Sequence, residues 1–263
     1  MIGAIFGDVV GSVFEFNNIK TKNFKLFADK STFTDDTVMT VAVADALTYF
    51  DKITDVTDFK SVLVYVMHLY GKRYSYAGYG GRFLRWLLTD SIEPYNSYGN
   101  GSAMRVSPVG WYATSLDEAI SLAKASAEVT HNHPEGIKGA EVTAGAIYLA
   151  RTGATKEAIK EFICRYYNMD FTLDKIRSTY EFNETCQNTV PQAMEAFLES
   201  ESFEDAIRNA VSIGGDSDTL GAICGSVAEA YYGLTGKEKE AALSYLDDTL
   251  RSKTEAFCKK YCK

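Results

Sequence analysis

The sequence predicts an all-α protein, an orthogonal bundle of many helices, from three observations. Apolar residues recur at helical spacing along most of the 263 residues. Polar residues typical of helix N-caps precede several of these stretches. The alternating pattern of half-buried strands is scarce. Only four prolines occur and no linker-like segment interrupts the chain, so we expect one domain over residues 1–263.

The first expected helix covers the apolar run of residues 1–16. Glycines fall four residues apart here and again in a later apolar stretch: Gly3, Gly7 and Gly11 in the first, Gly221 and Gly225 in the second. A helix face without side chains lets another backbone approach closely, although each glycine costs up to ~1 kcal/mol of helix propensity. The spacing therefore predicts two central helices that pack through glycine.

The remaining helices follow from caps and periodicity. Ser115 and Ser202 each precede an acidic first turn and an amphipathic stretch, which is typical of a capped helix. Residues 38–47 and 142–150 are apolar nearly all round, as buried central helices are. The apolar positions in residues 243–261 predict one long amphipathic helix at the C-terminal end.

Composition excludes several functional classes. A net charge of −8 and a pI near 5.0 disfavour long-range attraction to nucleic-acid phosphates and anionic lipids. The five cysteines have no disulfide-framework spacing, which favours a reducing cytoplasm. The N-terminal run lacks a basic segment and is too short to span a bilayer. We expect a cytoplasmic monomer that binds neither membranes nor unmodified nucleic acid.

Two acidic motifs each precede an apolar helix: Thr34-Asp35-Asp36-Thr37 and Gly214-Gly215-Asp216-Ser217-Asp218-Thr219. Ordinary N-capping explains one acidic residue in each motif, and a second carboxylate at the edge of an apolar core is costly without a counter-charge. A bound cation would compensate this charge. Carboxylate and hydroxyl oxygens suit Mg²⁺, with Mn²⁺ as the alternative, and four aspartates can hold two ions. We therefore expect the two motifs to converge.

Three further segments have both functional and structural interpretations. The pair His131 and His133 could bind zinc, but only His68 and no suitable cysteine pair accompany them. The loop from Gly99 to Ser102 could offer N–H groups to an anion, or could be a tight turn with Arg105 in an ion pair. Pro134 favours a helix start just after the histidines. The aromatic residues between positions 70 and 98 could form core or wall a pocket.

Taken in order, these motifs resemble the ADP-ribosylglycohydrolase family, which includes the dinitrogenase-reductase-activating glycohydrolase and the ADP-ribosyl-acceptor hydrolases. The matching motifs are Gly7-Asp8 with Glu15, Thr34-Asp35-Asp36-Thr37, Gly99-Asn100-Gly101-Ser102-Ala103-Met104-Arg105, His131, and Gly215-Asp216-Ser217-Asp218-Thr219. The resemblance extends from Gly3 to Gly233 and implies an all-α fold with two Mg²⁺ ions. It assigns the metal to Thr34, Asp35 and Asp36 from one side and to Asp216, Asp218 and Thr219 from the other.

The resemblance also implies roles in binding and catalysis. Asp218 would bridge the ions, and the catalytic residues would be Glu15, Asp36 and Asp218. ADP-ribose would contact Gly99, Asn100, Gly101, Ser102 and His131. Glu15 matches a glutamate on a mobile flap in the branch that acts on serine-linked ADP-ribose, whereas spacing alone describes it as a surface acid at a helix end. Ser97 stands where the arginine-directed branch has a carboxylate, so we expect a serine-type acceptor.

The function implied is hydrolysis of the bond between the anomeric carbon of ribose and an acceptor on a protein or small molecule, with ADP-ribose as product. One alternative is a relative that binds ADP-ribose or is structural and has lost the reaction, although all four metal-site aspartates are intact. Another is a metal-dependent phosphohydrolase acting on a nucleotide. The product distinguishes the three functions, because the hydrolase releases ADP-ribose, the phosphohydrolase releases AMP or phosphate, and the inactive relative releases nothing.

Overall fold

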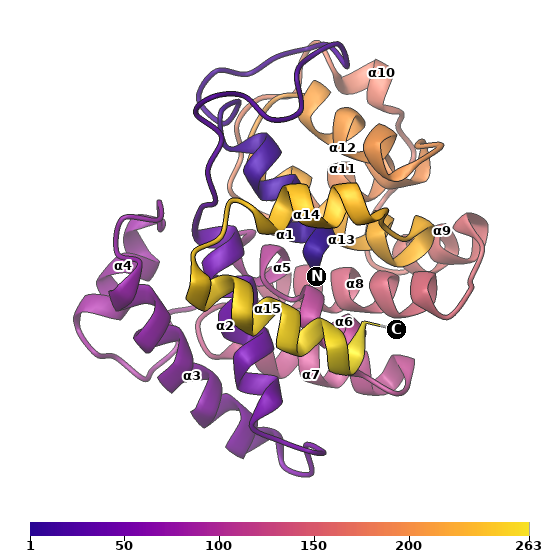
Figure 1. Cartoon of the computed structure of the whole chain (residues 1–263). Coiled ribbons are helices and arrows are strands. Elements are labelled where there is room, and N and C mark those ends of the chain that lie inside the picture. Colours follow the sequence, from indigo (N-terminus) through magenta and orange to yellow (C-terminus); the bar gives the residue numbers. More distant parts are fainter. Residues whose placement is uncertain (263) are drawn as a thin grey trace.

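The computed structural model describes residues 1–262 as a bundle of helices around a central pair (Figure 1). In chain order the helices are α1 (Ile2–Gly11), α2 (Asp35–Thr48), α3 (Val56–Arg73), α4 (Gly81–Leu88), α5 (Gly101–Met104), α6 (Ser107–Tyr112), α7 (Leu116–Glu128), α8 (Pro134–Arg151), α9 (Lys156–Cys164), α10 (Leu173–Ile176), α11 (Cys186–Leu198), α12 (Phe203–Ser212), α13 (Ser217–Tyr232), α14 (Gly236–Leu243) and α15 (Asp248–Tyr261). Within these residues the sole β pairing is an isolated bridge between Gly99 and Thr185. The all-α prediction is confirmed.

The central pair is α1 and α13, which lie side by side in the middle of the molecule (Figure 1). A Cβ atom on Gly7 would lie 1.9 Å from the carbonyl oxygen of Gly221, and one on Gly225 would lie 2.2 Å from that of Gly3. No side chain fits at such separations, so the backbones touch only because these residues are glycine. The predicted packing through glycine is confirmed.

A buried polar contact fixes the register of this pair. The N–H of Gly3 donates to the Glu229 carboxylate at 2.8 Å, across 226 positions of the sequence. Glu229 is 6% exposed and also pairs with the α-amino group of Met1. Since an unpaired buried carboxylate would be costly, these partners make Glu229 compatible with its place on α13.

Other expected helices also form as predicted. The side chains of Ser115 and Ser202 accept hydrogen bonds from the N–H groups of Glu118 and Asp205, so both serines are N-caps. The nearly all-apolar residues 38–47 and 142–150 lie within α2 and α8, most of whose residues are buried.

The first helix is shorter than predicted. It ends at Gly11 rather than extending through residue 16. The side-chain amide of Asn18 donates to the carbonyl oxygens of Phe14 and Glu15, both at 2.8 Å. A local bond of this kind offers the backbone an alternative to the helical ladder, so residues 12–17 form turns and bends.

The long C-terminal helix was a wrong prediction, because the chain breaks there into α14 and α15. Asp247 is the reason. Its Oδ1 accepts hydrogen bonds from the N–H groups of Thr249 and Leu250, both at 2.9 Å, and so starts a new helix within the amphipathic run.

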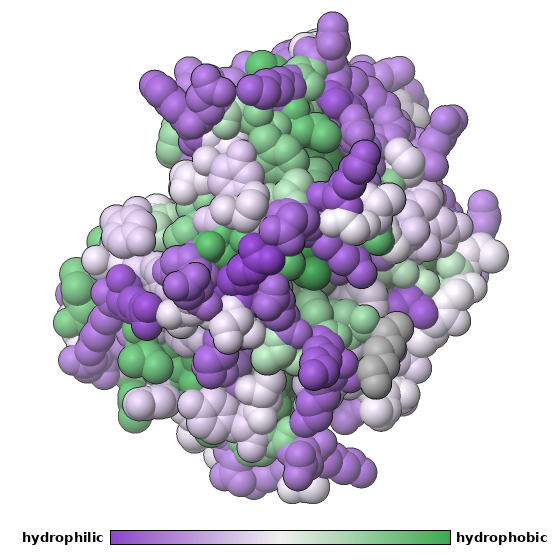
Figure 2. All heavy atoms as spheres, viewed as in Figure 1, coloured by the Kyte–Doolittle hydropathy of each residue, from purple (hydrophilic) through white to green (hydrophobic). Residues whose placement is uncertain are grey.

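The surface mixes polar and apolar side chains, as the face in Figure 2 shows. Large apolar residues with substantial exposure include Phe16 and Tyr76, which are 81% and 75% exposed. None of the helices in residues 1–262 combines the length and apolarity required to cross a membrane.

Candidate active site

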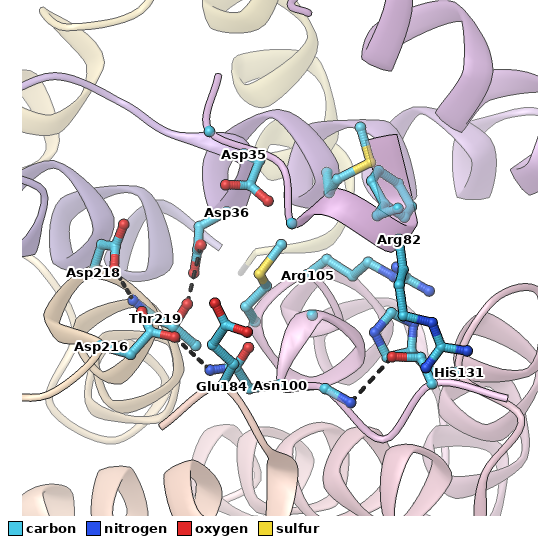
Figure 3. A pocket seen from close by; sticks show the side chains of 18 of the residues that line it. Asp35, Asp36, Arg82, Asn100, Arg105, His131, Glu184, Asp216, Asp218 and Thr219 are labelled. Atoms are coloured by element: carbon cyan, nitrogen blue, oxygen red, sulfur yellow. Dashed lines mark hydrogen bonds between the residues drawn. The ribbon is translucent and has the colours of Figure 1, made fainter. Parts of the chain in front are cut away.

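The two acidic motifs meet at one pocket, where α2 and α13 begin (Figure 3). Asp35 and Asp36 open α2, while Asp216 is the N-cap of α13 and Asp218 lies in its first turn. Asp35, Asp36, Asp216, Asp218 and Thr219 all line a cavity of about 240 Å³. The expected convergence of the motifs is therefore present in the fold.

The other predicted site residues divide into two groups. Glu15, Gly99, Asn100, Gly101 and His131 line the same cavity. Thr34 and Ser102 do not: the Ser102 hydroxyl donates to the carbonyl of Gly136 at 2.6 Å, and the Thr34 hydroxyl donates to Asp8 at 2.7 Å.

Asp8 holds the start of α2 in place. The backbone N–H groups of Thr34 and Thr37 donate to its carboxylate at 3.0 and 3.1 Å, and both threonine hydroxyls donate to it as well. Burial raises the pKa of Asp8 to about 6, against the lowering effect of these hydrogen bonds. The sequence interpretation missed this role, although an acid inside an apolar helical run was the available signal.

The acidic end of the pocket lacks counter-charge in residues 1–262. Burial first, and neighbouring carboxylates second, raise the pKa values of Asp35, Asp36 and Asp218 well above the ordinary range. Oδ1 of Asp36 is buried and has no hydrogen-bond partner in the described chain. Buried carboxylates that repel one another and keep a free oxygen are the donor set that a hard cation requires.

Glu15 joins this cluster from the turn after α1. One carboxylate oxygen from each of Glu15, Asp216 and Asp218 lies within 4.8 Å of the others. Burial, followed by repulsion from Asp216, Asp8 and Glu184, raises the pKa of Glu15 to about 7. The alternative of a surface acid at a helix end is wrong, since α1 ends at Gly11 and Glu15 is partly buried in the pocket.

The loop from Gly99 to Ser102 is hydrogen-bonded to the acidic end of the pocket through Asn100. The side-chain amide of Asn100 donates to Oδ2 of Asp216 at 2.7 Å and to the Thr189 hydroxyl at 3.2 Å. Its backbone N–H donates to the carbonyl of Glu184 at 2.7 Å. The end of this loop belongs to the short helix α5, which covers Gly101–Met104.

Arg105 does not form the ion pair that was expected if the loop from Gly99 to Ser102 were only a tight turn. Its guanidinium is fully buried and donates to the Ser126 carbonyl at 3.0 Å and to the Thr130 hydroxyl at 2.8 Å. No carboxylate of residues 1–262 forms a salt bridge with it. Its Nε also lacks a partner in this part of the chain, and burial lowers its pKa to about 10.

His131 is buried in the cavity wall and is neutral. Burial, then the positive charges of Arg105 and Arg82, lower its pKa well below the ordinary value. Its Nδ1 lies 2.7 Å from the Thr130 hydroxyl, and its Nε2 faces the loop, 3.1 Å from where a Cβ on Gly101 would lie. His133 instead caps α8 by accepting from the N–H of Glu135.

The end of the pocket away from the carboxylates is aromatic and basic. The guanidinium of Arg82 lies 5.0 Å from the centre of the Tyr95 ring, and Phe83 lines the cavity beside it. Figure 3 shows Arg82 and His131 across the pocket from the aspartates. The aromatic segment therefore supplies both core and pocket wall. Arg82, Phe182 and Glu184 were not predicted, because no local pattern marks them.

Comparisons with known proteins agree on one family. The family model described as ADP-ribosylglycohydrolase matches residues 1–260. The ADP-ribosylarginine hydrolase Tri1 of Pseudomonas putida is 26% identical, over 91% of this chain and 71% of its own. The ADP-ribosylhydrolase ARH3 of Mus musculus is 26% identical, over 89% of this chain and 83% of its own.

Two further matches are to another glycohydrolase and to a solved structure. The ADP-ribosyl-[dinitrogen reductase] glycohydrolase of Rhodospirillum rubrum is 28% identical, over 55% of this chain and 50% of its own. A solved structure titled "ADP-ribosylglycohydrolase-related protein complex" superposes with a TM-score of 0.65 at 26% identity, covering 97% of this chain and 94% of that one.

Proposed function

Because this chain belongs to the ADP-ribosylglycohydrolase family, we propose that it hydrolyses the bond between ADP-ribose and an acceptor. Water adds to the anomeric carbon of the ribose, the bond from that carbon to the acceptor breaks, and the acceptor takes up a proton. The observation that supports this proposal is the meeting of Glu15 with the aspartates of two distant helix starts in one cavity.

The carboxylate end fits a pair of Mg²⁺ ions. Its donors are all oxygens, they are buried, and Oδ1 of Asp36 is without a partner in residues 1–262. The proposed ligands are Asp35, Asp36, Asp216, Asp218 and Thr219, and Thr34 contributes by holding the start of α2 through Asp8. When bound, two Mg²⁺ ions would supply Lewis-acid charge beside the ribose and offset the repulsion among the carboxylates.

Proton transfer is assigned to Glu15. It is the one carboxylate of the cluster that comes from a turn rather than from a helix start, and no described residue donates a hydrogen bond to its carboxylate. Its pKa of about 7 suits a general acid or base at neutral pH. Cations bound beside it would lower that value, so the assignment rests mainly on its position.

The loop and the basic end are proposed to hold the ADP part of the substrate. Gly101 lines the cavity and donates no backbone hydrogen bond to another residue of the described chain, which leaves its N–H group for a phosphate oxygen. Neutral His131 adds a hydrogen-bonding edge without a charge, and Arg82 adds the positive charge. A dianionic diphosphate is repelled by the aspartates, so it would lie toward Arg82 while the ribose faces the carboxylates.

We propose a serine-type, O-linked acceptor. Two residues support this acceptor. Glu15 lies in the turn after α1 and matches the glutamate of the serine-directed branch. Ser97 lines the cavity at the position where the arginine-directed branch has a carboxylate. Without a negative charge there, a guanidinium acceptor would lack its natural partner. Tri1, which is named for ADP-ribosylarginine, and ARH3, whose name specifies no acceptor, are both 26% identical to this chain, so sequence identity does not determine the acceptor.

One assay tests the reaction and the acceptor together. Purified protein is incubated with peptides that have ADP-ribose on serine or on arginine, with and without Mg²⁺, and the products are separated. We expect free ADP-ribose, dependent on Mg²⁺ and faster from serine. Release of AMP or phosphate would indicate a phosphohydrolase, and binding of ADP-ribose without release would indicate an inactive relative.

A further inference from the structure

The position of Glu15 is electrostatically unfavourable and must be maintained by other residues. The carboxylates of Asp216, Asp8 and Glu184 all repel it. No donor in residues 1–262 bonds to its side chain, and the helix that would have fixed its backbone ends at Gly11. The turn that contains Glu15 therefore needs a contact with another part of the chain to hold it beside Asp216 and Asp218.

Asn18 makes that attachment. Its Oδ1 accepts from the N–H of Gly215 at 2.6 Å, and its Nδ2 donates to the carbonyl of the same residue at 2.9 Å. The same Nδ2 lies 2.8 Å from the carbonyl oxygens of Phe14 and Glu15. One side chain thus connects the backbone of Glu15 to the residue directly before Asp216.

The loop that contains Gly214 and Gly215 has a backbone conformation that permits this contact. Gly214 and Gly215 have φ angles of +72° and +79°, which side chains other than glycine rarely adopt. A Cβ on Gly214 would lie 3.0 Å from Oδ1 of Asn18, and one on Gly215 would lie 2.4 Å from the Tyr180 ring. Lys20 adds a second tie by donating to the carbonyls of Tyr180 and Ile213.

We propose that Asn18 is a positioning residue that holds Glu15 against Asp216 and Asp218 in the catalytic arrangement. The inference rests on the proposed function, because it takes Glu15 as the proton-transfer group. Asn18 is exposed, so water competes for its hydrogen bonds and the tie can open.

The first test is independent of activity and uses hydrogen–deuterium exchange. In Asn18→Ala the Gly215 amide loses its acceptor, so we expect faster exchange in residues 213–216 and in 12–17. Asn18→Asp keeps an acceptor for Gly215 but loses the donor, so exchange should increase only in 12–17. Asn17→Ala is the matched control, since the exposed Asn17 side chain forms none of these bonds. Unchanged exchange in Asn18→Ala would overturn the proposal.

The second test is a double-mutant cycle on turnover. We expect Asn18→Ala to lower kcat by about 10- to 100-fold with little change in KM, because small misplacement of a catalytic group has effects of that size. Combined with Glu15→Gln, Asn18→Ala should have no further effect, since Asn18 acts through Glu15. Equal losses in both backgrounds would overturn the proposal. Failure of wild-type protein to release ADP-ribose would refute the proposed function instead, and the exchange experiment would still test the tie.

Discussion

The hydroxyl of Thr219 donates a hydrogen bond to Oδ2 of Asp36 at 3.2 Å, across 183 positions of the sequence. This bond joins the starts of α2 and α13 and leaves Oδ1 of Asp36 without a partner in the described chain. The two acidic motifs are thus neighbours whose charges are only partly satisfied by protein groups. Removing or neutralising these charges should have measurable effects.

Replacing Asp218 with asparagine should separate metal binding from folding. The variant keeps the shape of the side chain but removes a buried, repelled charge, so the metal-free protein should gain about 1–3 kcal/mol in its free energy of unfolding. Mg²⁺ binding by calorimetry should be lost. Asp29→Asn, at a side chain that is 97% exposed, is the control. Magnesium affinity like that of wild type would contradict the proposed bridging role.

Glu15→Gln should impair chemistry and leave binding intact. The amide fills the same space but cannot exchange a proton, so turnover should fall about 10²–10⁴-fold while ADP-ribose affinity and melting temperature stay near wild type. Turnover is measured at saturating Mg²⁺ on serine-linked and arginine-linked substrates. A loss of only a few-fold on the active substrate would refute the assignment of proton transfer to Glu15.

Gly7→Ala should destabilise the central helix pair. The added Cβ would lie 1.9 Å from the carbonyl oxygen of Gly221, so α1 and α13 must separate, at a cost of about 3 kcal/mol or more. Gly236→Ala is the matched control, because nothing lies within 4 Å of a Cβ there and alanine favours the helix. Denaturant unfolding should show a large loss for the first variant and none for the second.

Asn100→Ala should weaken Mg²⁺ binding as well as ADP-ribose binding. From sequence alone we expect an effect on ADP-ribose only, but the side-chain amide donates to Oδ2 of Asp216. Loss of a hydrogen bond to a metal ligand typically costs 10- to 100-fold in metal affinity. Separate titrations with Mg²⁺ and ADP-ribose measure the two effects. Unchanged Mg²⁺ affinity would mean that Asp216 needs no support from the loop.

His131 should make stability fall in mild acid. Its pKa is depressed in the folded protein, so the unfolded chain binds the proton first, near its ordinary value of 6.5. The stability that neutral His131 contributes is therefore complete above pH 6.5. It is lost as the pH falls toward the pKa of His131 in the folded protein, at up to ~1.4 kcal/mol of unfolding free energy per pH unit. Relative to His131→Gln, the wild-type free energy of unfolding should decline between pH 6.5 and 5. Parallel pH profiles of the two proteins would contradict a buried neutral imidazole.

Much of the fold and site followed from local sequence patterns. The four-residue glycine spacing predicted two central glycine-faced helices, because it reflects a property of each helix face, and in the fold Gly7 contacts Gly221. The convergence of Asp36 and Asp218 followed from the cost of leaving paired acids at the heads of apolar helices. Such predictions succeed because the pattern that supports each of them lies within a few neighbouring residues of one helix.

What could not be predicted depends on distant partners. Residues 12–17 leave the helix beside an Asn18 side chain that is also bonded to Gly215, and Thr34 turns its hydroxyl to Asp8. Glu184 reaches the pocket from a segment without any motif, and Arg82 lies in the aromatic segment, where no pattern distinguished it. The break before α15 is different: Asp247 was a local signal, but the regular apolar spacing around it obscured the cap.

The pairing of α1 with α13 has a consequence for biosynthesis. The first helix of the chain buries its apolar and glycine face against one of the last, and Gly3 finds its carboxylate partner 226 positions later. During translation at ~5–20 residues per second, residues 2–11 therefore emerge roughly 10–45 s before α13 exists. Contacts of such long range also slow folding. We expect the nascent N-terminal segment to be the part of this protein that chaperones bind and that aggregates when synthesis is interrupted.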